Sequence, residues 1–131
     1  MSGPKEFTQL TELTGVHFRA VQAEFAGIVE REKRLRQNLA QLIESRQSRS
    51  AQLPQPGDAA LVAGADMRWQ QWVDQRRAVI NGELARVMVL KESCRARLQL
   101  AFGRDQATKA LQERAVQARL QTHRRRGAYE S

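Results

Sequence analysis

The chain is poor in the residues on which most catalytic and metal sites depend. It has one cysteine and two histidines, and His17 and His123 lie more than a hundred residues apart in sequence. A single cysteine excludes an intramolecular disulfide and a cysteine-based zinc site. The glycines are isolated, so no phosphate-binding loop is present. We therefore expect no enzymatic activity, no metal and no cofactor, and we expect Cys94 to be a small apolar residue of the core.

Long apolar runs are also missing. No stretch approaches the length of a membrane span, and residues 1–10 have neither the basic region nor the apolar region of a signal peptide. Together with the lone cysteine, this predicts a cytoplasmic protein.

The residues that are abundant favour long helices. Ala, Glu, Lys, Leu and Arg make up 63 of the 131 residues, whereas Leu, Ile, Val and Phe together number only 29. The first count is typical of coiled coils, and the second is too small for a large compact core. We therefore predict an all-α fold, an elongated antiparallel two-helix coiled-coil hairpin that forms one domain over residues 1–131.

A heptad pattern defines the first predicted helix, over about residues 5–53. Apolar residues recur in steps of three and four when Glu32, Arg46 and Arg49 are counted as polar members of the same seam. Nearer the N-terminus, the apolar stripe shifts phase around Gly15, which we interpret as a stutter. The seam residues are Phe18, Val21, Phe25, Ile28, Leu35, Leu39, Leu42 and Leu53, and the shifted stripe is Phe7, Leu10, Leu13 and Val16.

Two prolines and a glycine between Leu53 and Asp58 predict a turn, which we extend over about residues 54–65. The helical period then resumes, so the second helix is expected over about residues 66–126, with Gly127 as its end. Its predicted seam is Trp69, Val73, Arg76, Ile80, Glu83, Val87, Leu90, Cys94, Arg97, Ala101, Arg104, Thr108, Leu111, Ala115 and Ala118, widened by Leu84, Leu98 and Phe102.

Folding the chain at the turn pairs residues whose numbers add up to about 118. Glu32 should then lie near Arg86, while Arg46 and Arg49 should lie near Trp69, Trp72 and Asp74. Lys5 would lie opposite about residue 113, so the end of the second helix would have no partner. At about 1.5 Å per residue, this overhang is roughly 20 Å long.

The overhang is the most basic part of a chain whose net charge is +8. Residues 95–131 contain nine basic and three acidic side chains, which favours an anionic partner. The end is a solvated helix face, a docking surface for an acidic protein or a nucleic-acid contact. Few aromatic residues are there to stack on bases, which disfavours nucleic acid. The candidate partner-binding residues are Arg114, Arg119, Arg124, Arg125 and Arg126.

Trp69 and Trp72 are the other candidates. They stand three residues apart, so they lie on one side of the helix. Either they close the core near the turn, or they form an exposed aromatic pair that binds a protein.

The order of these features resembles the FliJ and YscO group of small cytoplasmic components of flagellar and injectisome type III export. The resemblance is carried by the start Phe7-x-x-Leu10-x-x-Leu13, the Pro/Gly turn and the run from Ala101 to Arg114. Two departures are the somewhat short chain and the Trp69/Trp72 pair, which matches no shared motif.

The resemblance implies a monomeric, non-enzymatic hairpin whose paired ends enter the ring of the export ATPase and stimulate it. It also implies contact with the membrane protein of the export gate. The alternatives from the residues themselves are a basic coiled coil that binds nucleic acid and a structural homodimer.

Overall fold

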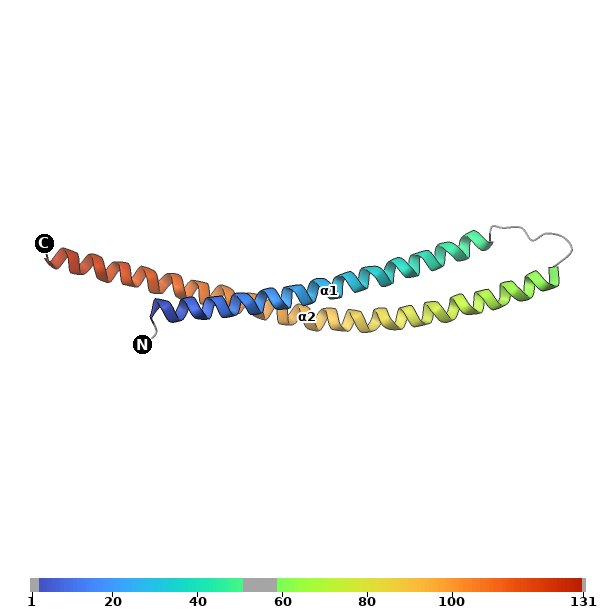
Figure 1. Cartoon of the computed structure of the whole chain (residues 1–131), viewed down its shortest axis with the longest axis horizontal. Helices are drawn as coiled ribbons and strands as arrows, with labels where there is room; N and C mark the ends of the chain where they lie inside the picture. The colour runs from blue at the N-terminus through green and yellow to red at the C-terminus, as the bar shows by residue number, and fades with distance from the viewer. Residues whose placement is uncertain (1–2, 51–58, 131) are drawn as a thin grey trace. The chain divides into compact units, whose positions relative to one another are not determined.

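A computed structural model describes residues 3–50 and 59–130, which form two helices and no strand (Figure 1). Helix α1 is Pro4–Ser50 and helix α2 is Ala59–Glu130. Pro4 occupies the first turn of α1, where a missing N–H costs nothing, and the N–H groups of Glu6 and Phe7 donate to the Gly3 carbonyl. The helices pack against each other, so the predicted all-α two-helix fold is confirmed.

The predicted bounds of the second helix were wrong at both ends. Helix α2 already includes residues 59–65, and it continues through Gly127 to Glu130. A glycine inside a helix costs only about 1 kcal/mol relative to alanine, and the alanines around Gly64 and next to Gly127 are strong helix formers. The predicted turn residues Pro54 to Asp58, and Leu53 with them, lie outside the described residues.

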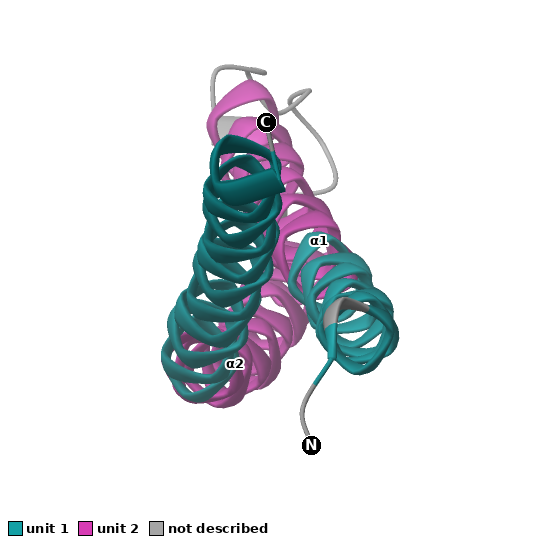
Figure 2. Cartoon of the chain, turned by 90° about the vertical axis from the view of Figure 1, so that its left-hand side faces the viewer, with its two compact units in different colours: residues 1–26, 93–131 teal, residues 27–92 magenta. Residues whose placement is uncertain are grey.

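The chain divides into two compact units, and each helix contributes one segment to each unit (Figure 2). Unit 1 comprises Met1–Ala26 and Ser93–Ser131, and unit 2 comprises Gly27–Glu92. The assignment of the whole chain to one domain stays a prediction. Within each unit the two segments run antiparallel, because residues later in α1 contact residues earlier in α2.

Unit 2 contains the apolar core. Four buried side chains form its centre, and three half-buried side chains of α1 pack against them. At one edge the Lys91 ammonium lies 2.8 Å from the Glu32 carboxylate, and at the other Arg46 lies 3.3 Å from Asp74. The Arg46 contact was predicted, whereas Glu32 meets Lys91 and not Arg86. The core side chains are Leu35, Ile80, Leu84 and Val87, with Ile28, Leu39 and Leu42 against them.

Unit 1 has a seam of smaller and more polar side chains. Val21, Cys94 and Ala101 are buried, and the Cys94 thiol points at the Val21 carbonyl at 3.9 Å. The buried position predicted for Cys94 is confirmed. The rings of Phe18 and Phe102 lie 5.6 Å apart between centroids, although Phe102 is half exposed.

Alternate seam positions predicted for α2 were displaced by one residue, although the prediction had included Leu84 and Leu98 as residues that widen the stripe. Val73, Ile80, Val87, Cys94 and Ala101 are buried as predicted, but the positions between them lie four residues later, not three. The reason is that both spacings fall on the same side of a helix, and Lys91, Asp105 and Gln112 at the later positions bond to side chains of α1 across the seam. The later positions are Arg77, Leu84, Lys91, Leu98, Asp105 and Gln112, whereas Arg76, Leu90, Arg97, Arg104 and Leu111 are exposed.

Candidate partner-binding site

The C-terminal segment of α2, residues 114–130, extends past the first turn of α1 within unit 1 (Figure 1). Across the seam, the Gln112 side-chain amide donates to the Thr8 hydroxyl at 2.9 Å, and every residue from 116 to 130 is exposed. Alanine, glutamine and arginine dominate this segment, and all are good helix formers. The segment is therefore a helix without a partner helix, as we predicted for the end of the second helix.

The five candidate arginines, Arg114, Arg119, Arg124, Arg125 and Arg126, all lie on this segment and are exposed. Among the described residues, none of them has a carboxylate within ion-pair distance. Glu130 is the one acidic residue of the segment. The segment therefore presents a concentrated positive charge, which attracts anionic surfaces by long-range electrostatics.

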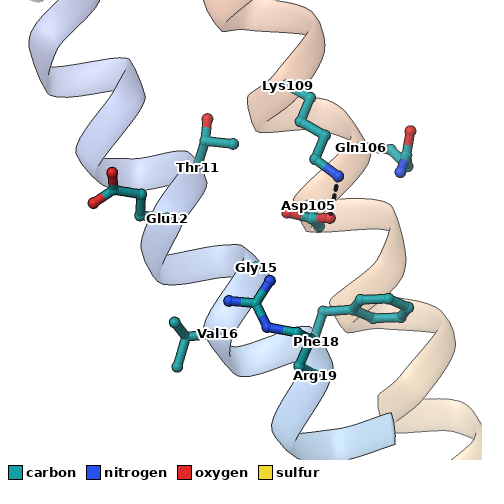
Figure 3. Close-up of a pocket in the computed structure, with 9 residues that line it drawn as sticks. All are labelled: Thr11, Glu12, Gly15, Val16, Phe18, Arg19, Asp105, Gln106 and Lys109. Atoms are coloured by element: carbon teal, nitrogen blue, oxygen red, sulfur yellow. Dashed lines mark ion pairs between the residues drawn. The ribbon is translucent and has the colours of Figure 1, made fainter.

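A polar layer crosses the seam of unit 1, and Figure 3 shows two of its members, the ion-paired Asp105 and Lys109. The Thr14 hydroxyl lies 3.2 Å from a carboxylate oxygen of Asp105 and 2.9 Å from the Thr108 hydroxyl. The other oxygen of Asp105 forms an ion pair with the Lys109 ammonium at 3.0 Å. Asp105 is only 3% exposed, so these partners take the place of water around its carboxyl group.

Charge pairs flank the seam in both units. In unit 1 the Arg97 guanidinium holds both oxygens of Glu24, at 2.6 and 3.1 Å. Hydrogen bonds from Arg97 lower the pKa of Glu24, and the same bonds raise the pKa of Arg97. In unit 2, hydrogen bonds from Lys91 and then Arg36 lower the pKa of Glu32. Both carboxylates are therefore held in the ionised form.

The structure turns the apolar stripe near the N-terminus outward. Leu10, Leu13 and Val16 are exposed, and Thr11 and Thr14 occupy the seam positions instead. The predicted stutter at Gly15 was wrong, because the seam continues in unbroken steps of four and three from Phe7 through Thr11, Thr14 and Phe18. Sequence reasoning missed this exposed stripe. The spacing of the seam residues continues without interruption through the two threonines, and this was the signal for the exposed stripe. We overlooked it because Leu10, Leu13 and Val16 are more hydrophobic than the threonines.

The two tryptophans have different surroundings. Trp69 is half buried, and the Arg49 guanidinium lies 4.7 Å from the centroid of its ring. That contact was predicted. Trp72 is 54% exposed. Trp69 therefore packs at the seam of unit 2, and only Trp72 of the pair is available to a binding partner.

Nothing in the described ranges groups three metal-ligating side chains, and none of the described helices is long and apolar enough to cross a membrane. Comparison with family models, curated proteins and solved structures found no match to this chain.

Proposed function

We propose that this chain is a non-enzymatic component of a type III or flagellar export apparatus that binds the export ATPase through the C-terminal segment and stimulates it. The observation that carries the proposal is the unpartnered, arginine-rich helix of residues 114–130 beside the start of α1. The partner is taken from the resemblance to the FliJ and YscO group. The export-gate membrane protein is the second partner that the resemblance implies.

The physical basis is a helix whose arginines are exposed to solvent and take no part in the packing of the hairpin. Five arginines stand free of carboxylates among the described residues, so no intramolecular ion pair must break before a partner carboxylate binds. Arginine also binds carboxylates with two parallel hydrogen bonds, which orients the partner as well as attracting it. An acidic pocket or ring fits this surface.

The test compares two variants with the same loss of charge. In one, Arg119, Arg124 and Arg125 are changed to glutamine; in the matched control, the exposed Arg31, Lys33 and Arg86 of unit 2 are changed to glutamine. We expect the wild type and the control to increase ATP turnover and ring assembly of the cognate export ATPase, and the first variant to lose at least about tenfold in affinity. If the folded wild type left turnover and assembly unchanged, the proposal would be wrong.

Nucleic-acid binding is the second candidate, favoured by the same arginines and by Tyr129, which is 92% exposed and able to stack on a base. It predicts affinity for single-stranded RNA or DNA that falls steeply as salt rises. Absence of binding at low salt would remove this candidate. A mass measurement in solution separates both candidates from a structural homodimer, since we propose a monomer.

A further inference from the structure

Unit 1 carries an apolar surface that its own seam does not use. Leu10, Leu13 and Val16 follow one another at intervals of three along α1, and Leu13 is 69% exposed. Exposed leucines scattered singly are ordinary, but three neighbouring apolar residues on one side of a helix form a patch. The patch coincides with the stretch where polar residues occupy the seam.

A groove joins this patch to α2. It has a volume of about 580 Å³, and Ala101 and Arg104 form its wall on α2. Leu100, Arg104 and Leu111 recur at intervals of four and seven, so they share one side of α2, and both leucines are exposed. The residues that line this Leu13 groove from α1 are Leu13, Thr14, Val16, His17 and Ala20.

The charge around the groove indicates what fits it. Arg97 is neutralised by Glu24, whereas Arg104 has no carboxylate partner among the described residues. Arg104 is the arginine that lines the groove, and no acidic side chain in the described part of the chain lines it, so a second copy of this surface would offer it a guanidinium and no carboxylate. A carboxylate-bearing partner would meet an unpaired guanidinium beside an apolar strip.

We propose that the Leu13 groove binds an acidic amphipathic helix of another protein, packed against α1 and α2 as a third helix. Apolar side chains of that helix, spaced three and four residues apart, would contact Leu10, Leu13 and Leu111. Its glutamates or aspartates would bind Arg104. A groove between two helices accepts a third helix in this way because its ridges are already spaced for knobs-into-holes packing. This surface is separate from the C-terminal segment and does not depend on the proposed function.

The experiment uses the full chain and three synthetic helices of about three heptads, with leucine at the core positions and glutamate, glutamine or lysine at the flanking positions. Fluorescence anisotropy measures affinity. We expect the glutamate helix to bind most tightly. Leu13→Gln should weaken it at least about tenfold, whereas Val89→Gln, an equally exposed apolar position in unit 2, should leave it unchanged.

Arg104→Glu should reverse the preference, so that the lysine helix binds more tightly than the glutamate helix. Circular dichroism confirms that each variant is folded, as expected for substitutions at exposed positions. Failure of all three helices to bind, or equal affinity of wild type and Leu13→Gln, would overturn the proposal. So would a wild-type dimer in sedimentation that Leu13→Gln dissociates, because the occupant would then be a second copy.

Discussion

Unit 2 and unit 1 are built from the same two helices and the same heptad spacing, yet the side chains at the centre of their seams differ in polarity. Unit 2 places Leu35, Ile80 and Val87 in the seam, where burial removes their surface from water. Unit 1 places Thr14 and Asp105 in the seam and turns leucines outward. The difference indicates that apolar packing holds the centre of unit 2, whereas polar contacts hold part of the seam of unit 1.

The largest effect expected from this comparison is on the core of unit 2. Ile80 is 2% exposed, so Ile80→Ala removes buried surface and leaves a cavity, which should lower the free energy of unfolding by about 3 kcal/mol. The neighbouring Val79 is exposed, and Val79→Ala should change it by less than about 0.5 kcal/mol. Urea unfolding followed by circular dichroism measures both. Equal losses would contradict the assignment of Ile80 to the core of unit 2.

The next effect should appear when unit 1 is given an apolar seam. Changing Thr14 and Thr108 to valine and Asp105 to leucine removes a buried carboxylate together with its partners, and such replacements stabilise by about 1–3 kcal/mol. The Lys109 side chain is half exposed, so its ammonium group can be hydrated when Asp105 is removed. We expect a higher urea midpoint. A lower midpoint would mean that the polar layer itself stabilises unit 1.

A third effect concerns the free energy of unfolding at acidic pH. Because the pKa of Glu32 is lowered below its ordinary value of 4.5, its ion pairs stabilise the fold above that pH. The contribution is lost as the pH falls from about 4.5 through the lowered pKa, where the folded carboxylate becomes protonated. Glu32→Gln should therefore flatten the dependence of stability on pH in that range.

Glu24 provides the control for this prediction. Its pKa is also lowered, but its side chain is half exposed, so solvent weakens the pair. Glu24→Gln should flatten the acid dependence less than Glu32→Gln. The reverse order, in thermal unfolding measured between pH 3 and 6, would contradict the assignment of the stronger pair to unit 2.

The sequence predicted the two helices, their pairing and the position of the overhang, because heptad spacing and a Pro/Gly turn are local signals. It failed where the seam is polar. Asp105 and Thr14 bond to each other across a sequence separation of ninety-one residues, so neither is recognisable as a core residue from its own helix. Hydrophobicity then assigned the leucines beside them to the seam. The Leu13 groove forms because polar residues occupy the seam and the neighbouring apolar residues face outward. The pattern of one helix alone cannot predict it, since both helices line the groove.

The smallest effect concerns the Arg49 contacts in unit 2. Arg49 lies 3.0 Å from Asp66 and stacks over Trp69, but it is partly exposed, so Arg49→Ala should cost about 0.5–1 kcal/mol. Arg49→Lys keeps the charge and loses the planar stacking. At high salt the Asp66 pair is screened while the indole contact persists, so the difference between the two variants should remain. Tryptophan fluorescence in a Trp72→Phe background reports on Trp69 alone. A difference that vanished at high salt would mean that the ion pair, and not the indole, holds Arg49.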